Sequence, residues 1–140
     1  MSSIQPYLFF DGRCEEAVEF YRKAVGADQI QLMRFKDAPE QPPPGMLPPG
    51  YENKVMHGEF RVGASTVLVS DGGEGPRPHS GFSLALQVAS VAEADRAFDA
   101  LKEGGEVRMP LAKTFWSPRF GMLTDKFGID WMVNIAGDAG

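Results

Sequence analysis

Several residue types that define other classes of protein are scarce in this chain of 140 residues. Cys14 is the only cysteine, which excludes an intramolecular disulfide and fits a reducing compartment. No stretch approaches the roughly 20 apolar residues of a membrane span, and no basic segment leads into an apolar one near the start. We therefore expect a cytoplasmic protein that does not associate with membranes.

The chain also lacks an excess of positive charge. Its 14 lysines and arginines are scattered among 19 acidic residues, and the formal net charge is -5. This balance opposes attraction to phosphate backbones, so we expect no nucleic-acid partner. The only two histidines, His57 and His79, lie far apart in the sequence and are a poor supply of ligands for a metal ion.

An internal repeat is the main feature that the sequence does contain. Two segments separated by 77 residues each predict a strand followed by an amphipathic helix, and Glu16-Ala17 aligns with Glu93-Ala94. Ser90 and Glu93 form a capping box in which each satisfies a free amide at the start of the second helix. One buried face is predicted for each helix: Cys14, Ala17, Val18, Tyr21, Ala24 and Val25 in the first, and Val91, Ala94, Phe98 and Leu101 in the second.

Three predicted strands follow each helix, so each half of the chain is βαβββ. They cover residues 30–35, 54–62 and 66–70 in the first half, and 107–111, 119–124 and 129–135 in the second. We expect an α+β fold in which two βαβββ modules form a cupped mixed sheet, because a lone module leaves one sheet face uncovered. The single domain, 1–140, would hold a first module at about 4–70, a linker at about 71–80 and a second module at about 81–136.

Six of the 11 prolines fall in residues 37–53, which predicts a long extended loop rather than a strand. A loop of this length is a lid, a partner surface or disordered, and the sequence does not choose among the three. Asp71 directly follows a predicted strand and is interpreted as a turn cap.

Strand alternation predicts which side chains line the open face of the second module. Its first strand places Ser83, Ala85 and Gln87 opposite an apolar row. In the last strand Asp130, Met132 and Asn134 face away from Trp131, Val133 and Ile135. We expect the apolar rows to pack on the helices and the polar rows to face a ligand.

The motifs of the chain resemble those of the PhnB-like family, which belongs to the vicinal oxygen chelate superfamily with glyoxalase, bleomycin-resistance proteins and extradiol dioxygenases. The resemblance runs from Pro6 to Asn134 and implies a fold like that of glyoxalase, bleomycin-resistance protein and dihydroxybiphenyl dioxygenase. The motifs are Pro6-Tyr-Leu-x-Phe10, Glu16-Ala17-x-x-Phe20-Tyr21, Met56-His57, Ser70-Asp71, Met109-Pro110-Leu111, Thr114-Phe115-Trp116, Phe120-Gly121-Met122 and Asp125-x-Phe127-Gly128-x-x-Trp131-Met132-Val133-Asn134.

The resemblance also implies where a metal would be held. Enzymes of the superfamily bind a divalent ion with histidine and glutamate side chains on the concave sheet face. The corresponding positions here hold Pro6, Ser83 and Met132, and the closing strand of the first half offers only Thr66, Leu68 or Ser70. We therefore predict no metal and no cofactor. His57 and Glu59 share one strand face, either as part of a relocated site or as a solvated surface.

Three functions stay open. The first, which we favour, is a PhnB-like protein that binds an unknown small organic molecule without a catalytic metal, through Ser83, Gln87, Trp116, Asp130, Asn134, His57 and Glu59. The second is a metal-dependent lyase, isomerase or dioxygenase with atypical ligands. The third is a dimeric structural or regulatory protein that uses the proline-rich segment for contact. Superfamily members commonly pair, so we expect a homodimer. Some relatives carry a methyltransferase label, but no glycine-rich nucleotide loop supports it here, and no catalytic residue is assigned.

Overall fold

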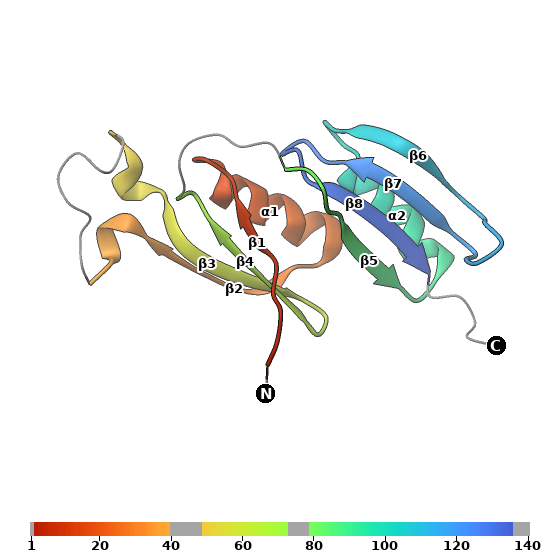
Figure 1. Ribbon diagram of the computed structural model, residues 1–140, viewed down its shortest axis with the longest axis horizontal. Coiled ribbons are helices and arrows are strands. Elements are labelled where there is room, and N and C mark those ends of the chain that lie inside the picture. The colour runs from red at the N-terminus through yellow and green to blue at the C-terminus, as the bar shows by residue number, and fades with distance from the viewer. Residues whose placement is uncertain (1, 40–48, 73–78, 136–140) are drawn as a thin grey trace. The chain divides into compact units, whose positions relative to one another are not determined.

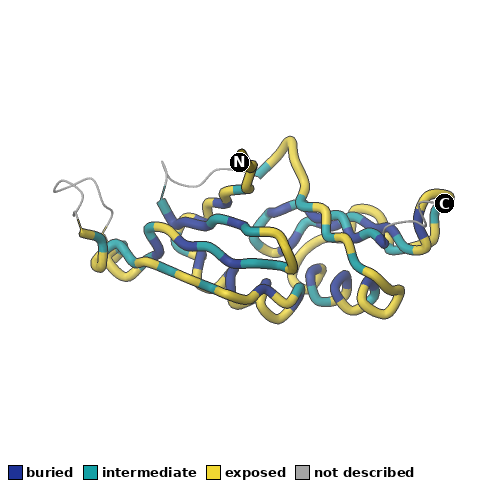
Figure 2. The backbone as a smooth tube through the Cα atoms, turned by 90° about the horizontal axis from the view of Figure 1, so that it is seen from below, coloured by how far each residue is buried: buried dark blue, intermediate teal, exposed yellow. Residues whose placement is uncertain are grey.

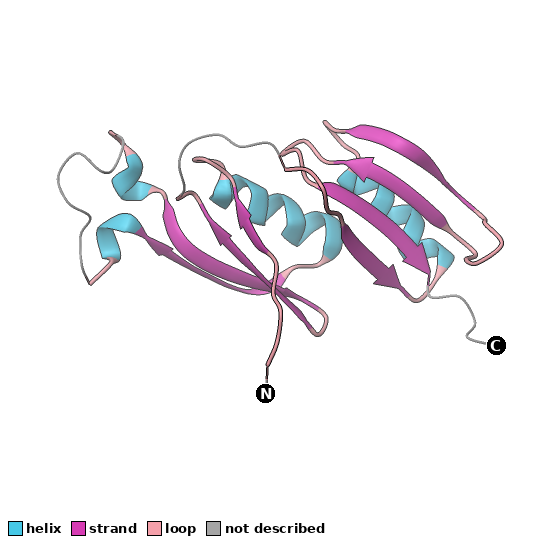
Figure 3. Cartoon of the chain, in the orientation of Figure 1, coloured by secondary structure: helices cyan, strands magenta, loops and turns pink. Residues whose placement is uncertain are grey.

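A computed structural model describes residues 2–39, 49–72 and 79–135. The chain divides into two compact units, Met1–Arg77 and Pro78–Gly140, which we call unit 1 and unit 2. In each unit one α-helix lies against one face of a four-stranded mixed sheet (Figure 1, Figure 3). The two predicted βαβββ modules are thereby confirmed. Residues 40–48 of the proline-rich segment and 73–78 of the expected linker lie outside the described residues.

Unit 1 begins with β1 (Tyr7–Phe9), α1 (Cys14–Val25) and β2 (Asp28–Arg34). Two short 3-10 helices, η1 (Phe35–Asp37) and η2 (Tyr51–Asn53), precede β3 (Val55–Val62) and β4 (Ser65–Ser70). The strand order is β1-β4-β3-β2. β1 is parallel to β4, and the other two strand pairs are antiparallel.

Unit 2 repeats this arrangement. It contains β5 (Leu84–Val88), α2 (Val91–Leu101), β6 (Glu106–Ala112), β7 (Phe120–Thr124) and β8 (Asp130–Ile135). The strand order is β5-β8-β7-β6, with β5 parallel to β8 and the other two pairs antiparallel. The same order in both units matches the repeat seen in the sequence.

The helices bury the faces that their apolar spacing predicts. In α1 the buried side chains are Cys14, Ala17, Val18, Tyr21 and Ala24, and the Tyr21 ring packs 5.9 Å from that of Phe60. In α2 they are Ala94, Ala97, Phe98 and Leu101. Buried positions recur along both helices in Figure 2. The prediction for Val91 is wrong, since this side chain is 40% exposed. A side chain in a helix points back over the preceding turn. Val91 is the first residue of α2, so its side chain has no preceding helical turn to pack on.

A buried aspartate holds unit 1 together. The Asp71 carboxylate accepts hydrogen bonds from the backbone N–H groups of Gly12, Cys14 and Val55, at 2.7, 2.8 and 3.0 Å. The residue at the N-cap of α1, Arg13, makes no capping bond with its side chain. Asp71 follows the last strand of unit 1 in the sequence, and its carboxylate caps the start of this helix. This finding corrects the interpretation of Asp71 as a local turn cap at the start of a linker.

A second buried aspartate has a related role in unit 2. Asp125 accepts hydrogen bonds from the backbone N–H groups of Phe127 and Ile129 and from the Trp131 indole, at 2.9, 3.0 and 2.9 Å. Gly128 adopts a φ of 86°, the left-handed conformation that the predicted hairpin needs. These contacts fix where β8 begins and orient Trp131 into the core.

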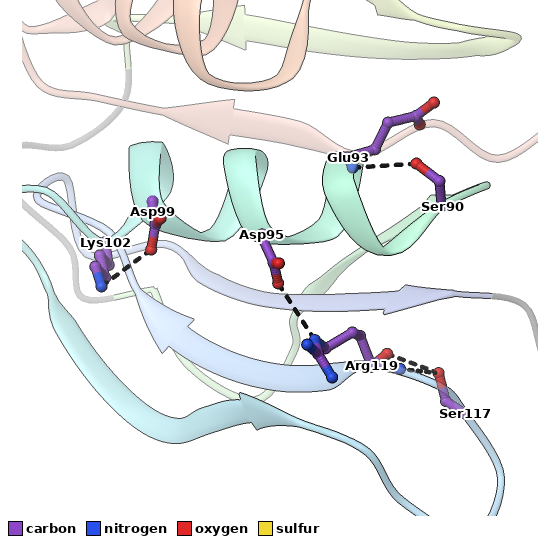
Figure 4. Close-up of polar contacts among 7 residues, drawn as sticks. All are labelled: Ser90, Glu93, Asp95, Asp99, Lys102, Ser117 and Arg119. Carbon is purple, nitrogen blue, oxygen red and sulfur yellow. Dashed lines mark hydrogen bonds and ion pairs between the residues drawn. The ribbon is translucent and has the colours of Figure 1, made fainter.

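Figure 4 shows polar contacts within and beside α2, including one that joins the helix to the residue before β7. Ser90 Oγ accepts a hydrogen bond from the Glu93 N–H at 3.1 Å, and the Glu93 carboxylate accepts one from the Ala89 N–H at 3.5 Å. The Ser90 half of the predicted capping box is thus confirmed, whereas Glu93 reaches the N–H of the residue before the N-cap. Farther along the helix Asp95 pairs with Arg119 at 3.3 Å. The buried Ser117 hydroxyl lies 2.6 Å from the Arg119 carbonyl oxygen and 2.8 Å from that of Ile135.

Candidate functional site

The candidate site occupies the face of the unit 2 sheet that points away from α2. Burial alternates along β8, where Trp131, Val133 and Ile135 are buried and the residues between them are partly exposed. The register places Gln87 beside Asn134, and Asn134 beside Phe120. Three strands, β5, β8 and β7, therefore contribute side chains to one open surface, as the strand parity predicts for β5 and β8.

Asn134 has the most unusual environment on this surface. Its side-chain amide donates a hydrogen bond of 2.9 Å to Gln87 Oε1. Its own oxygen, Oδ1, is buried and has no hydrogen-bond partner among the described residues. A buried acceptor without a donor costs about 1–3 kcal/mol, and native proteins contain few such groups.

Asp130 is already engaged within the sheet. Its Oδ1 accepts hydrogen bonds from Thr124 Oγ1 at 2.6 Å and from Arg108 Nη1 at 3.2 Å. The carboxylate thus joins side chains of β6, β7 and β8.

Trp116 stands at the margin of the surface, in the loop between β6 and β7. Its ring packs edge-on against Phe120 at 5.3 Å, and it is 47% exposed. Thr114 Oγ1 accepts a hydrogen bond from the Ser117 N–H at 3.1 Å, which helps to fix the loop. Ser83 is exposed and lies just before β5. The five candidate residues of the second module therefore belong to one unit.

The other two candidates, His57 and Glu59, lie on the open face of the unit 1 sheet. The Tyr7 hydroxyl and His57 Nδ1 are joined by a hydrogen bond of 2.9 Å, and Tyr7 stacks on Phe9. Glu59 lies between Leu68 and Gln31 in the strand register. Near it, Arg61 Nε is buried without a hydrogen-bond partner among the described residues.

Unit 1 also contains a polar cavity of about 320 Å³ that sequence reasoning missed. Arg34 donates a hydrogen bond of 2.6 Å to Glu15, which lowers the pKa of that carboxyl group below its ordinary value. Lys54 Nζ donates to the Gly12 carbonyl oxygen at 3.0 Å. The lining carboxylates and cations thus pair with groups of the unit itself. The lining residues are Gly12, Glu15, Arg34, Asn53, Lys54, Val55 and Asp71.

The residues present do not fit the metal centre that the superfamily implies. No three histidine, cysteine, aspartate or glutamate side chains of the described ranges converge as metal ligands. One ring nitrogen of His57 is bonded to Tyr7, and the buried carboxylates of Asp71 and Asp125 accept from N–H groups of their own units.

The fold of this chain is shared with a solved structure of low sequence identity. A glyoxylase/bleomycin resistance protein/dioxygenase domain from Frankia sp. EAN1pec has the same fold, with a TM-score of 0.66 and 15% identity over 100% of this chain and 95% of that chain. The 3-demethylubiquinone-9 3-methyltransferase family, which includes PhnB-like proteins, matches residues 2–134. The chain therefore belongs to this family, and it shares the fold of the glyoxalase and bleomycin-resistance domain. The recognition of the PhnB-like family from the sequence is confirmed.

Its relatives agree with this assignment. Protein YjdN of Escherichia coli K12 is 35% identical over 94% of each chain. The crystal structure of protein PA1353 from Pseudomonas aeruginosa shares 40% identity and a TM-score of 0.85, covering 99% of this chain and 100% of that one. A putative 3-demethylubiquinone-9 3-methyltransferase, PhnB protein, from Bacillus cereus shares 28% identity and a TM-score of 0.75, over 96% and 100%. Among the described residues, no helix has the length and apolar character needed to cross a membrane.

Proposed function

We propose that this chain binds a small organic molecule on the open face of the unit 2 sheet, with no metal ion in the site. The observation that carries the proposal is the buried Asn134 Oδ1, which has no donor among the described residues. A ligand that moves aside the side chains covering Oδ1 and donates a hydrogen bond would satisfy this atom, so its binding would recover the cost of leaving the oxygen unpaired.

Neighbouring residues support a binding role. Gln87 holds the Asn134 amide in place through the 2.9 Å hydrogen bond, which leaves Oδ1 as the acceptor. Trp116 adds an exposed aromatic wall that rests on Phe120. Largely apolar surfaces with a few fixed polar groups are typical of sites for small molecules.

The family's name refers to methyl transfer, but this chain offers little support for that reaction. A conventional methyltransferase holds its nucleotide donor with a glycine-rich loop between a strand and a helix. The two such connections here are residues 10–13 and 89–90, which contain Gly12 as their only glycine. Ligand binding therefore accounts for the site better than methyl transfer does.

A thermal-shift screen of a library of neutral small organic molecules tests the proposal. A ligand at 100 times its dissociation constant adds about 2.7 kcal/mol to the free energy of unfolding, which raises the melting temperature measurably. Asn134→Leu, which removes the acceptor at similar volume, should reduce the shift clearly, because it removes one hydrogen bond and keeps the apolar contacts. Asn53→Leu, an exposed asparagine in unit 1, is the matched control and should keep it.

Two results would overturn the proposal. One is that every hit shifts the melting temperature of Asn134→Leu as much as that of the unchanged protein, because the ligands then bind elsewhere. The other is one divalent ion per chain, found by elemental analysis of protein purified without chelator and lost on mutation of Asp130, because a metal ion would then lie in the proposed site. The homodimer and the cytoplasmic location stay predictions from the sequence.

A further inference from the structure

A stripe of methionines crosses the open face of the unit 2 sheet. The strand register places Ala85 beside Met132, Met132 beside Met122, and Met122 beside Met109. Each of the four strands therefore contributes one small or flexible apolar side chain to a single row. Met122 and Met132 are partly exposed, and Met109 is 43% exposed. We call these four residues the methionine stripe.

Polar groups flank the stripe on both sides. On one side is the amide pair of Gln87 and Asn134, and on the other are Thr124 and Asp130, bonded to each other at 2.6 Å. Alternate residues of a strand are about 7 Å apart, so the stripe is one side chain wide on β5 and β8, and Phe120 extends the apolar surface on β7. It crosses three gaps between strands of about 4.8 Å each, and so extends for about 14 Å.

These dimensions limit what the stripe could hold. A stable protein partner usually covers about 800 Å² on each side, far more than four side chains in a row provide. A long, narrow apolar surface suits a long, flat molecule instead. Methionine sulfur is polarizable and makes favourable contacts with aromatic rings, and its flexible chain adapts to ligands of different outline.

We propose that the methionine stripe binds a flat, fused-ring aromatic or conjugated molecule that is uncharged and donates one hydrogen bond to Asn134 Oδ1. This inference rests on the proposed function and specifies its ligand class. An ionised fatty acid fits less well, because its carboxylate has no proton to donate to Oδ1. The edge of a phenol or of an N–H heteroaromatic ring supplies both the flat body and the donor.

Methionine methyl groups provide a direct readout. Protein labelled with ¹³C at the methionine methyls would be titrated with 2-naphthol and followed by two-dimensional NMR. The signals of Met109, Met122 and Met132, assigned by single Met→Leu variants, should shift. Those of Met33 and Met56 in unit 1 serve as internal references and should not.

A set of matched probes distinguishes the contribution of the aromatic ring to binding from that of the hydrogen-bond donor. 2-Methoxynaphthalene has the same ring system without the hydroxyl proton, and we expect it to bind roughly tenfold more weakly than 2-naphthol. Asn134→Leu should bring the two affinities together, whereas Asn53→Leu should preserve the difference. Decanol supplies a donor on a flexible aliphatic chain and should bind more weakly than 2-naphthol.

The failures of the two proposals are distinguishable. If decanol shifts the stripe methyls with the same dependence on Asn134, and 2-naphthol does not, the ligand class is wrong and the proposed function stands. If 2-naphthol shifts only Met33 or Met56, or if the stripe signals change with protein concentration alone, the stripe is not a site for this class of ligand. If 2-naphthol and 2-methoxynaphthalene bind equally, the donor role of the ligand is refuted.

Discussion

Asn134 donates its side-chain amide to Gln87 across the parallel pair of β8 and β5, at 2.9 Å, and its oxygen is left buried and unpaired. The first prediction follows from this arrangement. Asn134→Leu should raise the free energy of unfolding of the ligand-free protein by about 1 kcal/mol, because it removes an unsatisfied buried acceptor. Urea unfolding would measure the change. A loss of stability of similar size would show that the amide pair supports the fold.

The Asp71 carboxylate should be essential to unit 1. In Asp71→Asn one acceptor oxygen becomes an NH₂ group that faces a backbone N–H, so at least one of the three hydrogen bonds becomes a donor-donor contact. We expect a loss of about 3 kcal/mol in urea unfolding. Asp99→Asn, at an exposed pair with Lys102, is the matched control and should change stability by less than about 0.5 kcal/mol. Equal effects of the two substitutions would contradict the capping role.

Burial raises the pKa of the Cys14 thiol far above its ordinary value, and the nearby carboxylate of Asp71 adds to the effect. The folded chain keeps this proton, whereas the unfolded chain releases it above pH ~8.5. Stability should therefore be constant with respect to this group below pH ~8.5 and fall by up to about 1.4 kcal/mol per pH unit above it. Denaturant unfolding at pH 7.5, 8.5 and 9.5 would show the slope.

A Cys14→Ala variant provides the control for this pH dependence, since it should lose the part of the slope that comes from the thiol. Iodoacetamide should also leave native Cys14 unmodified and alkylate it in urea, because the native side chain is fully buried. Fast alkylation of the native protein would refute this prediction.

Gly121 marks a close approach between β7 and α2. A Cβ atom there would lie 2.8 Å from Phe98 Cε2 and 2.9 Å from the Leu111 Cα. Gly121→Ala should therefore cost about 2 kcal/mol through overpacking, measured by thermal or urea unfolding. Combining it with Phe98→Leu should cost less than the sum of the two single changes, because the smaller side chain relieves one contact. Strict additivity would argue against the clash.

The elements of both units could be predicted because their patterns are local. The spacing of Ala17, Val18 and Tyr21 defines a helix face by itself, and the alternation of Trp131, Val133 and Ile135 defines a strand face. The alternation of side chains along each strand was enough to place Gln87 and Asn134 on the same open surface. Their hydrogen bond could not be predicted, because it depends on the register between β5 and β8.

Other features of the site depend on contacts between distant residues. The methionine stripe could not be read from the sequence, because register shifts in the pairing of β6 with β7 change which residue of β6 faces Met122. The polar cavity of unit 1 joins residues from four places in the chain, including Gly12, Arg34 and Asp71. No spacing pattern links such positions, and only the fold brings them together.

The capping of α1 by Asp71 also bears on how the protein is made. The carboxylate that completes the start of this helix is encoded 57 positions after Cys14, the residue whose N–H it accepts. Before position 71 has emerged from the ribosome, the nascent chain already contains the helix sequence. The N–H groups at the start of the helix can then form hydrogen bonds only with water. The first unit should therefore become protease-resistant in a single late step, when its final strand and the aspartate that follows arrive together.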